Sequence, residues 1–191
     1  FVRDASVGEF GLSYQHRRPV KELIAERLPA TLELALVSAI LALAIGIPMG
    51  VYTALKRYGF LSRTFMTISL VGVSLPTFLI GILLILFFGV ILRWLPTFGR
   101  GDVVEIGWWT SGFLTASGLK SLIMPSITLA LFQMTLIMRL VRAEMLEVLR
   151  ADFIKFARAR GLPTRAVHFR HALKNTLVPV ITITGLQLGS I

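Results

Sequence analysis

The sequence contains no cysteine, so it can form neither a disulfide framework nor a metal site built from thiolates. Charged residues are also scarce, because only 16% of the 191 residues are Asp, Glu, Lys or Arg. Acidic residues are the rarer kind, with 10 against 20 basic residues. These shortages exclude a disulfide-stabilised secreted domain, and they make the positions of the few charges informative.

Long intervals of the chain carry no charge, namely residues 64–92, 121–138 and 175–191. Between residues 28 and 55 the only charged residue is Glu33. A helix that crosses a bilayer needs about 20 mostly apolar residues. The sequence therefore predicts an all-α fold, a polytopic bundle of transmembrane helices. We expect three full spans and part of a fourth, at residues 28–55, 64–92, 122–141 and from 175 onward.

Both ends of the sequence look cut. The chain begins with Phe1 rather than Met, and its last apolar stretch stops at Ile191, before a full span is complete. We therefore expect a piece of a longer protein, in which at least one further helix precedes Phe1.

The net formal charge of +10 is concentrated between the apolar intervals. Basic loops of membrane proteins stay on the cytoplasmic side. We therefore place residues 56–63 and 139–174 in the cytoplasm, and residues 93–120, with only three basic residues and all three tryptophans, outside. Residues 1–27 then form an extracytoplasmic segment with a short interfacial helix at residues 20–28, and residues 28–191 form the membrane domain.

The longest polar interval between apolar stretches is the basic segment, residues 144–175. From Arg139 to Lys174 there are nine Lys or Arg residues against three acidic ones. Apolar side chains recur in it at helical spacing, which predicts one amphipathic helix up to Arg160. The side chains of that face are Leu146, Leu149, Phe153 and Phe156.

Gly161 favours a helix end at this position, and Pro163 prevents simple continuation. A second short helix is expected from Thr164. Two helices joined at a glycine would form a compact unit on the membrane surface, suited to contact another protein. Binding of nucleic acid by the same cations is disfavoured, because the apolar face has no role in holding phosphates.

Groupings typical of catalysis are missing from the sequence. His168 and His171 are three residues apart, but the neighbouring cations, among them Arg170, would repel a metal ion, so we predict no metal site. No Ser, His and acid grouping indicates a nucleophile, and no carboxylate pair lies in a span. Glu33 is the one acid within a predicted span, near an end where its side chain can extend to the interface. A protein of this kind is not an enzyme, and uphill transport would need energy from a partner.

Two features within the predicted spans fit a translocation path. Pro76, close to Ser74, interrupts the second span and frees a carbonyl that needs a partner or a wet cavity. Gln133 is the one large polar residue of the third span. A packing kink and a hydrogen bond between helices remain equally good interpretations. The pair Gly46 and Gly50, four residues apart, favours close packing of helices.

Several motifs resemble the dipeptide/oligopeptide permease family, the membrane subunits of binding-protein-dependent ABC importers. In the basic segment these are Asp152-Phe-Ile-Lys-Phe-Ala-Arg-Ala-Arg-Gly-Leu and Arg170-His-Ala-Leu-Lys-Asn, followed by Pro179. Elsewhere they are Gly11-Leu-Ser-Tyr, Leu28-Pro-Ala-Thr-Leu-Glu-Leu, Ser74-Leu-Pro-Thr-Phe and Leu95-Pro-Thr-Phe-Gly. The resemblance covers nearly the whole chain, with the motifs in the family's order.

The resemblance implies that residues 144–175 are a coupling loop, which docks in a groove of a cytoplasmic ATPase. The wider superfamily has a Glu-Ala-Ala signature followed, after three residues, by Gly. Aligned on Gly161, only Ala157 and Gly161 match, while Lys155 and Phe156 depart as is usual in the peptide branch. The residues expected to couple to the ATPase are Asp152, Phe153, Phe156, Ala157, Arg160, Gly161 and Leu162.

The function implied is that of a permease of the type I ABC importer kind for di- and oligopeptides, in a bacterial or archaeal cytoplasmic (inner) membrane. The expected partners are ATPase subunits that bind ATP and Mg²⁺, a second homologous permease, an external solute-binding protein and membrane lipid. The chain itself is expected to bind no cofactor and no nucleic acid. Alternatives are import of nickel or glutathione by the same kind of permease, or a stand-alone carrier or channel whose basic loop anchors to lipid.

Overall fold

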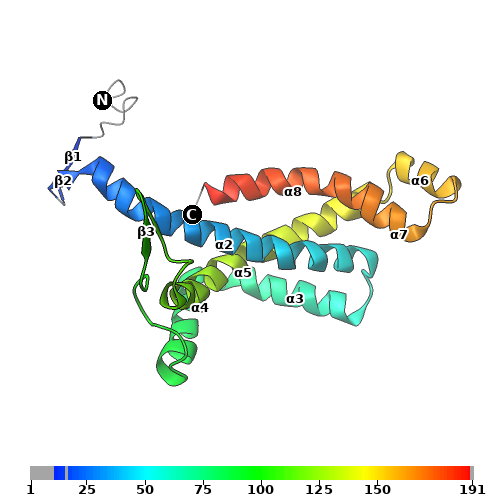
Figure 1. Cartoon of the computed structure of the whole chain (residues 1–191). Coiled ribbons are helices and arrows are strands. Elements are labelled where there is room, and N and C mark those ends of the chain that lie inside the picture. Colours follow the sequence, from blue (N-terminus) through cyan, green and yellow to red (C-terminus); the bar gives the residue numbers. More distant parts are fainter. Residues whose placement is uncertain (1–10, 16, 190–191) are drawn as a thin grey trace.

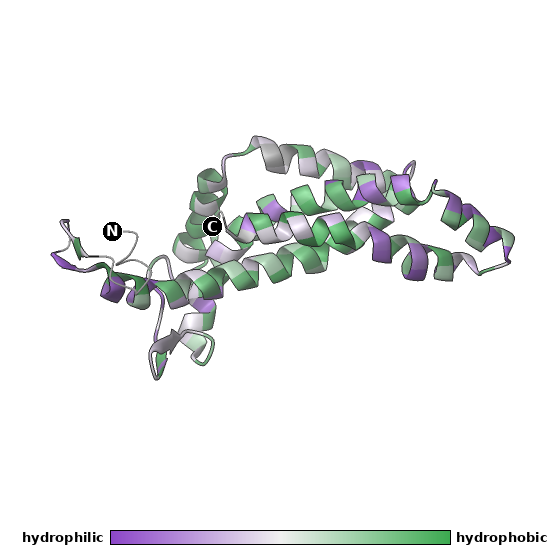
Figure 2. Cartoon of the chain, turned by 90° about the horizontal axis from the view of Figure 1, so that it is seen from above, coloured by the Kyte–Doolittle hydropathy of each residue, from purple (hydrophilic) through white to green (hydrophobic). Residues whose placement is uncertain are grey.

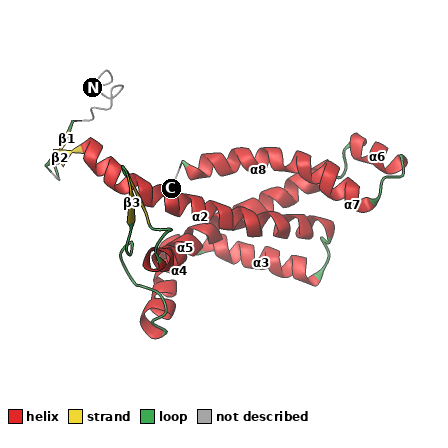
Figure 3. Cartoon of the chain, viewed as in Figure 1, coloured by secondary structure: helices red, strands yellow, loops and turns green. Residues whose placement is uncertain are grey.

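The computed structural model describes residues 11–15 and 17–189, and within them it is predominantly helical, which confirms the predicted fold class (Figure 3). The helices are α2 (Val20–Leu55), α3 (Phe60–Ser74), α4 (Thr77–Leu84), α5 (Ala116–Val148), α6 (Asp152–Ala159), α7 (Thr164–Ala166) and α8 (Leu173–Leu188), with π-helical turns η1 (Ile85–Ile91) and η2 (Val167–Ala172). Two antiparallel hairpins complete it, β1 (Leu12–Ser13) with β2 (Arg18–Pro19) and β3 (Val104–Ile106) with β4 (Trp109–Ser111).

Two of the described helices, α2 and α5, are long and apolar enough to cross a membrane. With 36 and 33 residues they are each about 50 Å long, more than a hydrocarbon core of roughly 30 Å requires. The separate interfacial helix expected at residues 20–28 is wrong, because these residues are the first turns of α2. Pro29 lies inside α2 and does not end it. The rest of the helix keeps its backbone N–H and C=O groups hydrogen-bonded, as a membrane requires.

The interruption predicted at Pro76 is confirmed. α3 ends at Ser74, Pro76 stands as the N-cap of α4, and the chain changes direction between the two helices (Figure 1). Proline cannot continue the hydrogen-bond ladder of α3, and instead its carbonyl accepts from the N–H of Leu79 at 3.0 Å. The second predicted span is therefore two shorter helical segments rather than one helix.

The core forms where α2 and α5 pack side by side (Figure 1). A Cβ added at Gly50 would lie 2.6 Å from the Cβ of Val141, and one at Gly46 would lie 3.0 Å from the carbonyl oxygen of Met134. The close packing predicted for this glycine pair is confirmed. Hydrophilic residues gather toward the two ends of the bundle (Figure 2).

The basic segment is divided differently from the prediction. The single helix expected up to Arg160 is wrong, because α5 ends at Val148 and α6 begins at Asp152. Turn hydrogen bonds close the intervening residues, with the N–H of Arg150 donating to the carbonyl of Glu147 and that of Ala151 to Val148, both at 3.0 Å. This turn reorients α6 so that another of its faces is buried.

Candidate functional site

Helix α6 has one buried face and one exposed apolar face. Ile154 is fully buried and Ala157 is 6% exposed, in the same core cluster as Val167 of η2. Phe153 and Phe156, by contrast, are 46% and 63% exposed. An exposed aromatic pair on a short helix is a surface that a groove on another protein can accept.

The residue pattern found only half of this arrangement. The exposed apolar face predicted for docking is confirmed for Phe153 and Phe156, whereas Leu146 and Leu149, which were assigned to the same face, pack against the core. The spacing did not indicate Ile154, the buried residue that anchors α6. Ala157, which was grouped with the coupling residues, also packs inward. Its small side chain lets α6 approach η2 instead of offering a contact surface.

Gly161 ends α6 with a Schellman motif, as the stop predicted at this residue requires. Its φ is +76°, its N–H donates to the carbonyl of Arg158 at 2.9 Å, and the N–H of Leu162 donates to that of Ala157 at 3.3 Å. Glycine reaches this left-handed conformation without the steric cost that a side chain adds. Pro163 then stands before α7, so a helix begins at Thr164 as predicted. It is not a separate short helix, because α7, η2 and α8 follow one another without a gap up to Leu188.

Cations border the exposed face of α6. The guanidinium of Arg160 lies over the ring of Phe156, 5.6 Å from its centroid, and Leu162 beside it is 38% exposed. Lys155 and Asp152 form an exposed ion pair at 2.8 Å, which contributes little to stability. Of the predicted coupling residues, Phe153, Phe156, Arg160 and Leu162 thus lie on the surface together with Asp152.

The two histidines of the basic segment lie in η2. In the part of the chain that the structure describes, no group of three or more His, Cys, Asp or Glu is placed to hold a metal ion. Burial lowers the pKa of His168, and the nearby charge of Arg158 lowers it further. Both effects favour the neutral imidazole of His168.

Gln133 lines a cavity of about 520 Å³ between α2, α4, α5 and α8. Its side chain is buried, and among the described residues its Oε1 has no hydrogen-bond partner. The lining residues are Ala30, Thr31, Leu34, Thr77, Leu129, Phe132, Gln133 and Gln187. A mostly apolar hollow with a few hydroxyl and amide groups is typical of a small-molecule site.

The structure does not bring the three predicted path residues together. Gln133 lines the cavity, but Ser74 and Pro76 do not. The Ser74 hydroxyl donates to the carbonyl of Leu70 at 2.9 Å, within its own helix. Thr77, the residue after Pro76, reaches the cavity instead, since the break at the proline starts α4 beside α5.

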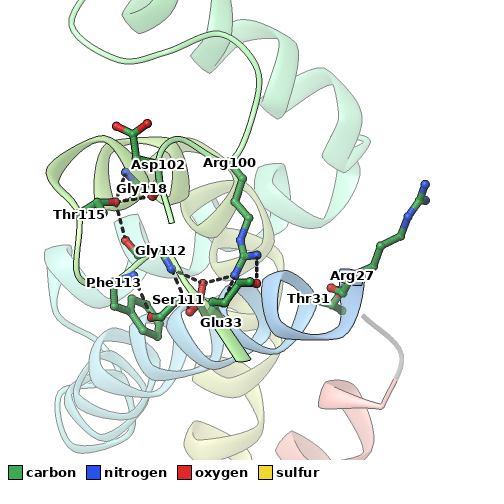
Figure 4. A network of polar contacts seen from close by, with 11 residues as sticks. Arg27, Thr31, Glu33, Arg100, Asp102, Ser111, Gly112, Phe113, Thr115 and Gly118 are labelled. Carbon is green, nitrogen blue, oxygen red and sulfur yellow. Dashed lines mark hydrogen bonds and ion pairs between the residues drawn. The ribbon is translucent and has the colours of Figure 1, made fainter. Parts of the chain in front are cut away.

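Glu33 is the centre of a buried polar network where β4 lies against α2 (Figure 4). Its side chain is 2% exposed, and its Oε2 accepts from the guanidinium of Arg100 at 3.0 Å. The N–H of Gly112 donates to both carboxylate oxygens at 3.2 Å. The expectation that Glu33 extends to the interface is therefore wrong, because Arg100 and Gly112 satisfy its charge inside the protein.

This network fastens the predicted outer loop to α2. In the structure that loop ends before α5, which begins at Ala116. Arg100 also donates to the Thr110 hydroxyl at 2.7 Å, so one guanidinium joins α2, the loop and β4. The sequence held a signal for it, since a lone acid in a span usually has a basic partner. The partner is 67 residues away, and nothing in the spacing indicated which of the loop's three cations it is.

Comparison with known proteins agrees with the motifs. Residues 46–191 match the family described as binding-protein-dependent transport system inner membrane component. The dipeptide transport system permease protein DppB of Alkalihalophilus pseudofirmus is 36% identical over the whole chain, and the di/tripeptide transport system permease protein DppB of Pseudomonas aeruginosa is 38% identical over the whole chain. The oligopeptide transport system permease protein AppB of Bacillus subtilis is 41% identical over 96% of the chain.

The chain spans 61%, 60% and 56% of the lengths of these three relatives. The family match covers most of the chain, including α5, the basic segment and α8. The chain therefore belongs to the family of binding-protein-dependent transport system inner membrane components.

Proposed function

We propose that this chain is part of a permease subunit that lines the translocation path of an ATP-driven importer for di- and oligopeptides. Family membership supports the transporter class, and the names of the similar permeases support peptides as substrates. The observation that carries the proposal is α6, a separate amphipathic helix that presents Phe153 and Phe156 beside cations at the cytoplasmic end of the bundle.

In this proposal, α6 docks in a groove of a cytoplasmic ATPase subunit. Phe153, Phe156 and Leu162 supply the apolar contact, and Arg160 supplies a charged rim. ATP binding would close two ATPase subunits, draw the two coupling loops of a permease pair together and turn the cavity outward. Hydrolysis in the partner would reset it, so this chain needs no nucleotide site of its own.

The cavity lined by Gln133 would form one wall of the path. Its hydroxyl and amide groups, from Thr31, Thr77 and Gln133, can exchange hydrogen bonds with peptide groups, while the apolar lining tolerates varied side chains. A peptide delivered by an external solute-binding protein would pass such a wall without tight binding. Weak, replaceable contacts suit a path better than a deep specific site.

The test replaces Phe156 by Asp in the full-length permease, expressed with its transporter partners. We expect uptake of radiolabelled dipeptide to fall at least tenfold and less ATPase to co-purify, because a carboxylate replaces a desolvated ring. The matched control is Phe60→Asp, at an aromatic residue of α3 that is 84% exposed. Normal uptake by the Phe156 variant would refute coupling through α6. Uptake of nickel instead of peptide by the unaltered transporter would refute the assignment of peptides as its substrates.

A further inference from the structure

A second hollow lies at the cytoplasmic end of the bundle and shares no lining residue with the cavity of the proposed path. It has a volume of about 550 Å³. It lies between the turn that joins α2 to α3 and the end of α5. Its lining residues are Ala54, Leu55, Lys56, Arg57, Tyr58, Gly59, Leu146, Leu149 and Arg150.

The chemistry of this hollow is divided between floor and rim. Leu55, Leu146 and Leu149 are partly buried and pack against the core, so they give an apolar floor. Lys56, Arg57 and Arg150 are exposed and bring three positive charges. No acidic residue lines it, and within the described residues none of the three cations has an ion-pair partner. Such a hollow fits an amphipathic anion.

The rim is held in place by the fold. The buried Ser62 hydroxyl donates to the carbonyl of Lys56 at 2.6 Å, and the N–H of Gly59 donates to the same oxygen at 2.9 Å. The guanidinium of Arg57 lies 4.6 Å from the centroid of the Tyr58 ring. The cations are therefore brought together by fixed turns rather than by chance on a flexible loop.

We propose that this hollow binds the headgroup and upper acyl region of an anionic phospholipid of the cytoplasmic leaflet. Basic pockets at the cytoplasmic ends of membrane helices suit anionic headgroups, and a tyrosine at the rim suits the membrane–water interface. A lipid is favoured over free phosphate because the leucine floor offers nothing to a small hydrophilic anion. A bound lipid would brace the α2–α3 turn against the end of α5, next to the start of the coupling loop.

The test measures retention of phosphatidylglycerol by the full-length permease, purified in its transporter complex, with native mass spectrometry and with phosphatidylcholine as the neutral reference. The variant replaces Lys56, Arg57 and Arg150 by Gln. The matched control replaces Arg63, Arg139 and Lys174 by Gln, three exposed cations outside the hollow. Each rim cation also has a single Gln variant, in case the triple variant does not fold.

We expect the triple rim variant to bind phosphatidylglycerol about a hundredfold more weakly, each single variant about fivefold more weakly, and the control almost normally. Equal loss in the rim and control variants would overturn the proposal in favour of a diffuse basic surface. No loss in either variant would overturn it too, because the rim cations would then not hold the lipid. Displacement of the lipid by excess inorganic phosphate would assign the hollow to a free anion. Loss of the lipid whenever the ATPase is bound would assign it to the ATPase interface.

Discussion

The buried pair of Glu33 and Arg100 allows a prediction with a definite asymmetry. Removing one partner of a buried ion pair typically costs about 3–5 kcal/mol, because the other charge is left uncompensated. Arg100→Gln leaves the carboxylate of Glu33, which is 2% exposed, with only neutral donors, the N–H of Gly112 among them. We therefore expect this change to destabilise the attachment of the outer loop by about 3 kcal/mol or more.

Glu33→Gln is expected to cost less, about 1–3 kcal/mol. The new carboxamide still offers an oxygen to the N–H of Gly112, and Arg100, whose side chain is 25% exposed, can turn toward water. The two substitutions thus differ in effect although they break the same pair. The difference follows from the burial of the two side chains, not from the distance between them.

Hydrogen exchange of the Gly112 amide in the detergent-purified protein measures local opening of this attachment. A loss of about 3 kcal/mol accelerates exchange through opening by roughly a hundredfold. Lys120→Gln is the control, since it removes an exposed cation in the first turns of α5, close to the same loop. The reasoning is refuted if Arg100→Gln exchanges no faster than the control, or if Glu33→Gln is the more damaging of the two.

Three further predictions concern packing, turn geometry and charge. Gly50→Val should destabilise the bundle by about 1–3 kcal/mol or more in thermal unfolding, because its Cβ would collide with the facing valine of α5, whereas Gly185→Val, with nothing within 4 Å, should not. Gly161→Val should reduce peptide uptake while Gly161→Asn largely retains it, since asparagine tolerates positive φ and open space surrounds the site. The pKa of His168 lies below its ordinary value of 6.5, so the folded basic segment favours neutral imidazole. The contribution of His168 to the free energy of unfolding is therefore fully present above pH 6.5 and is lost as the pH falls below it. In circular dichroism melts, His168→Gln should remove this dependence on pH.

The sequence predicted the elements that depend on local chemistry. The long uncharged intervals indicated the long helices α2 and α5, because a membrane span needs about 20 mostly apolar residues. Pro76 indicated the break and Gly161 indicated the end of α6, because each acts on its own stretch of backbone. The packing of Gly46 and Gly50 was also predictable, since small residues one turn apart leave room for a second helix.

Features that depend on distant contacts were missed. The turn between α5 and α6 was not predicted, because the leucine and phenylalanine spacing is continuous across it and the burial of Ile154 against Val167 decides the direction of α6. Glu33 was interpreted as an interfacial side chain for the same reason. Its partner comes from a loop 67 residues later, and helical spacing carries no information on that pairing.

The position of Ile154 in the core has a consequence for how the proposed coupling would work. Ile154 of α6, Val167 of η2 and Met145 of α5 belong to one buried cluster, which continues along α5 to Ile137. Cores packed as densely as crystals move as units rather than deform gradually. A displacement of α6 by an ATPase would therefore pass to α5 as a whole. Gln133 lies 12 residues before Met145 on that helix, about 18 Å along its axis, so the cavity wall would move with the docking surface without any change inside α5.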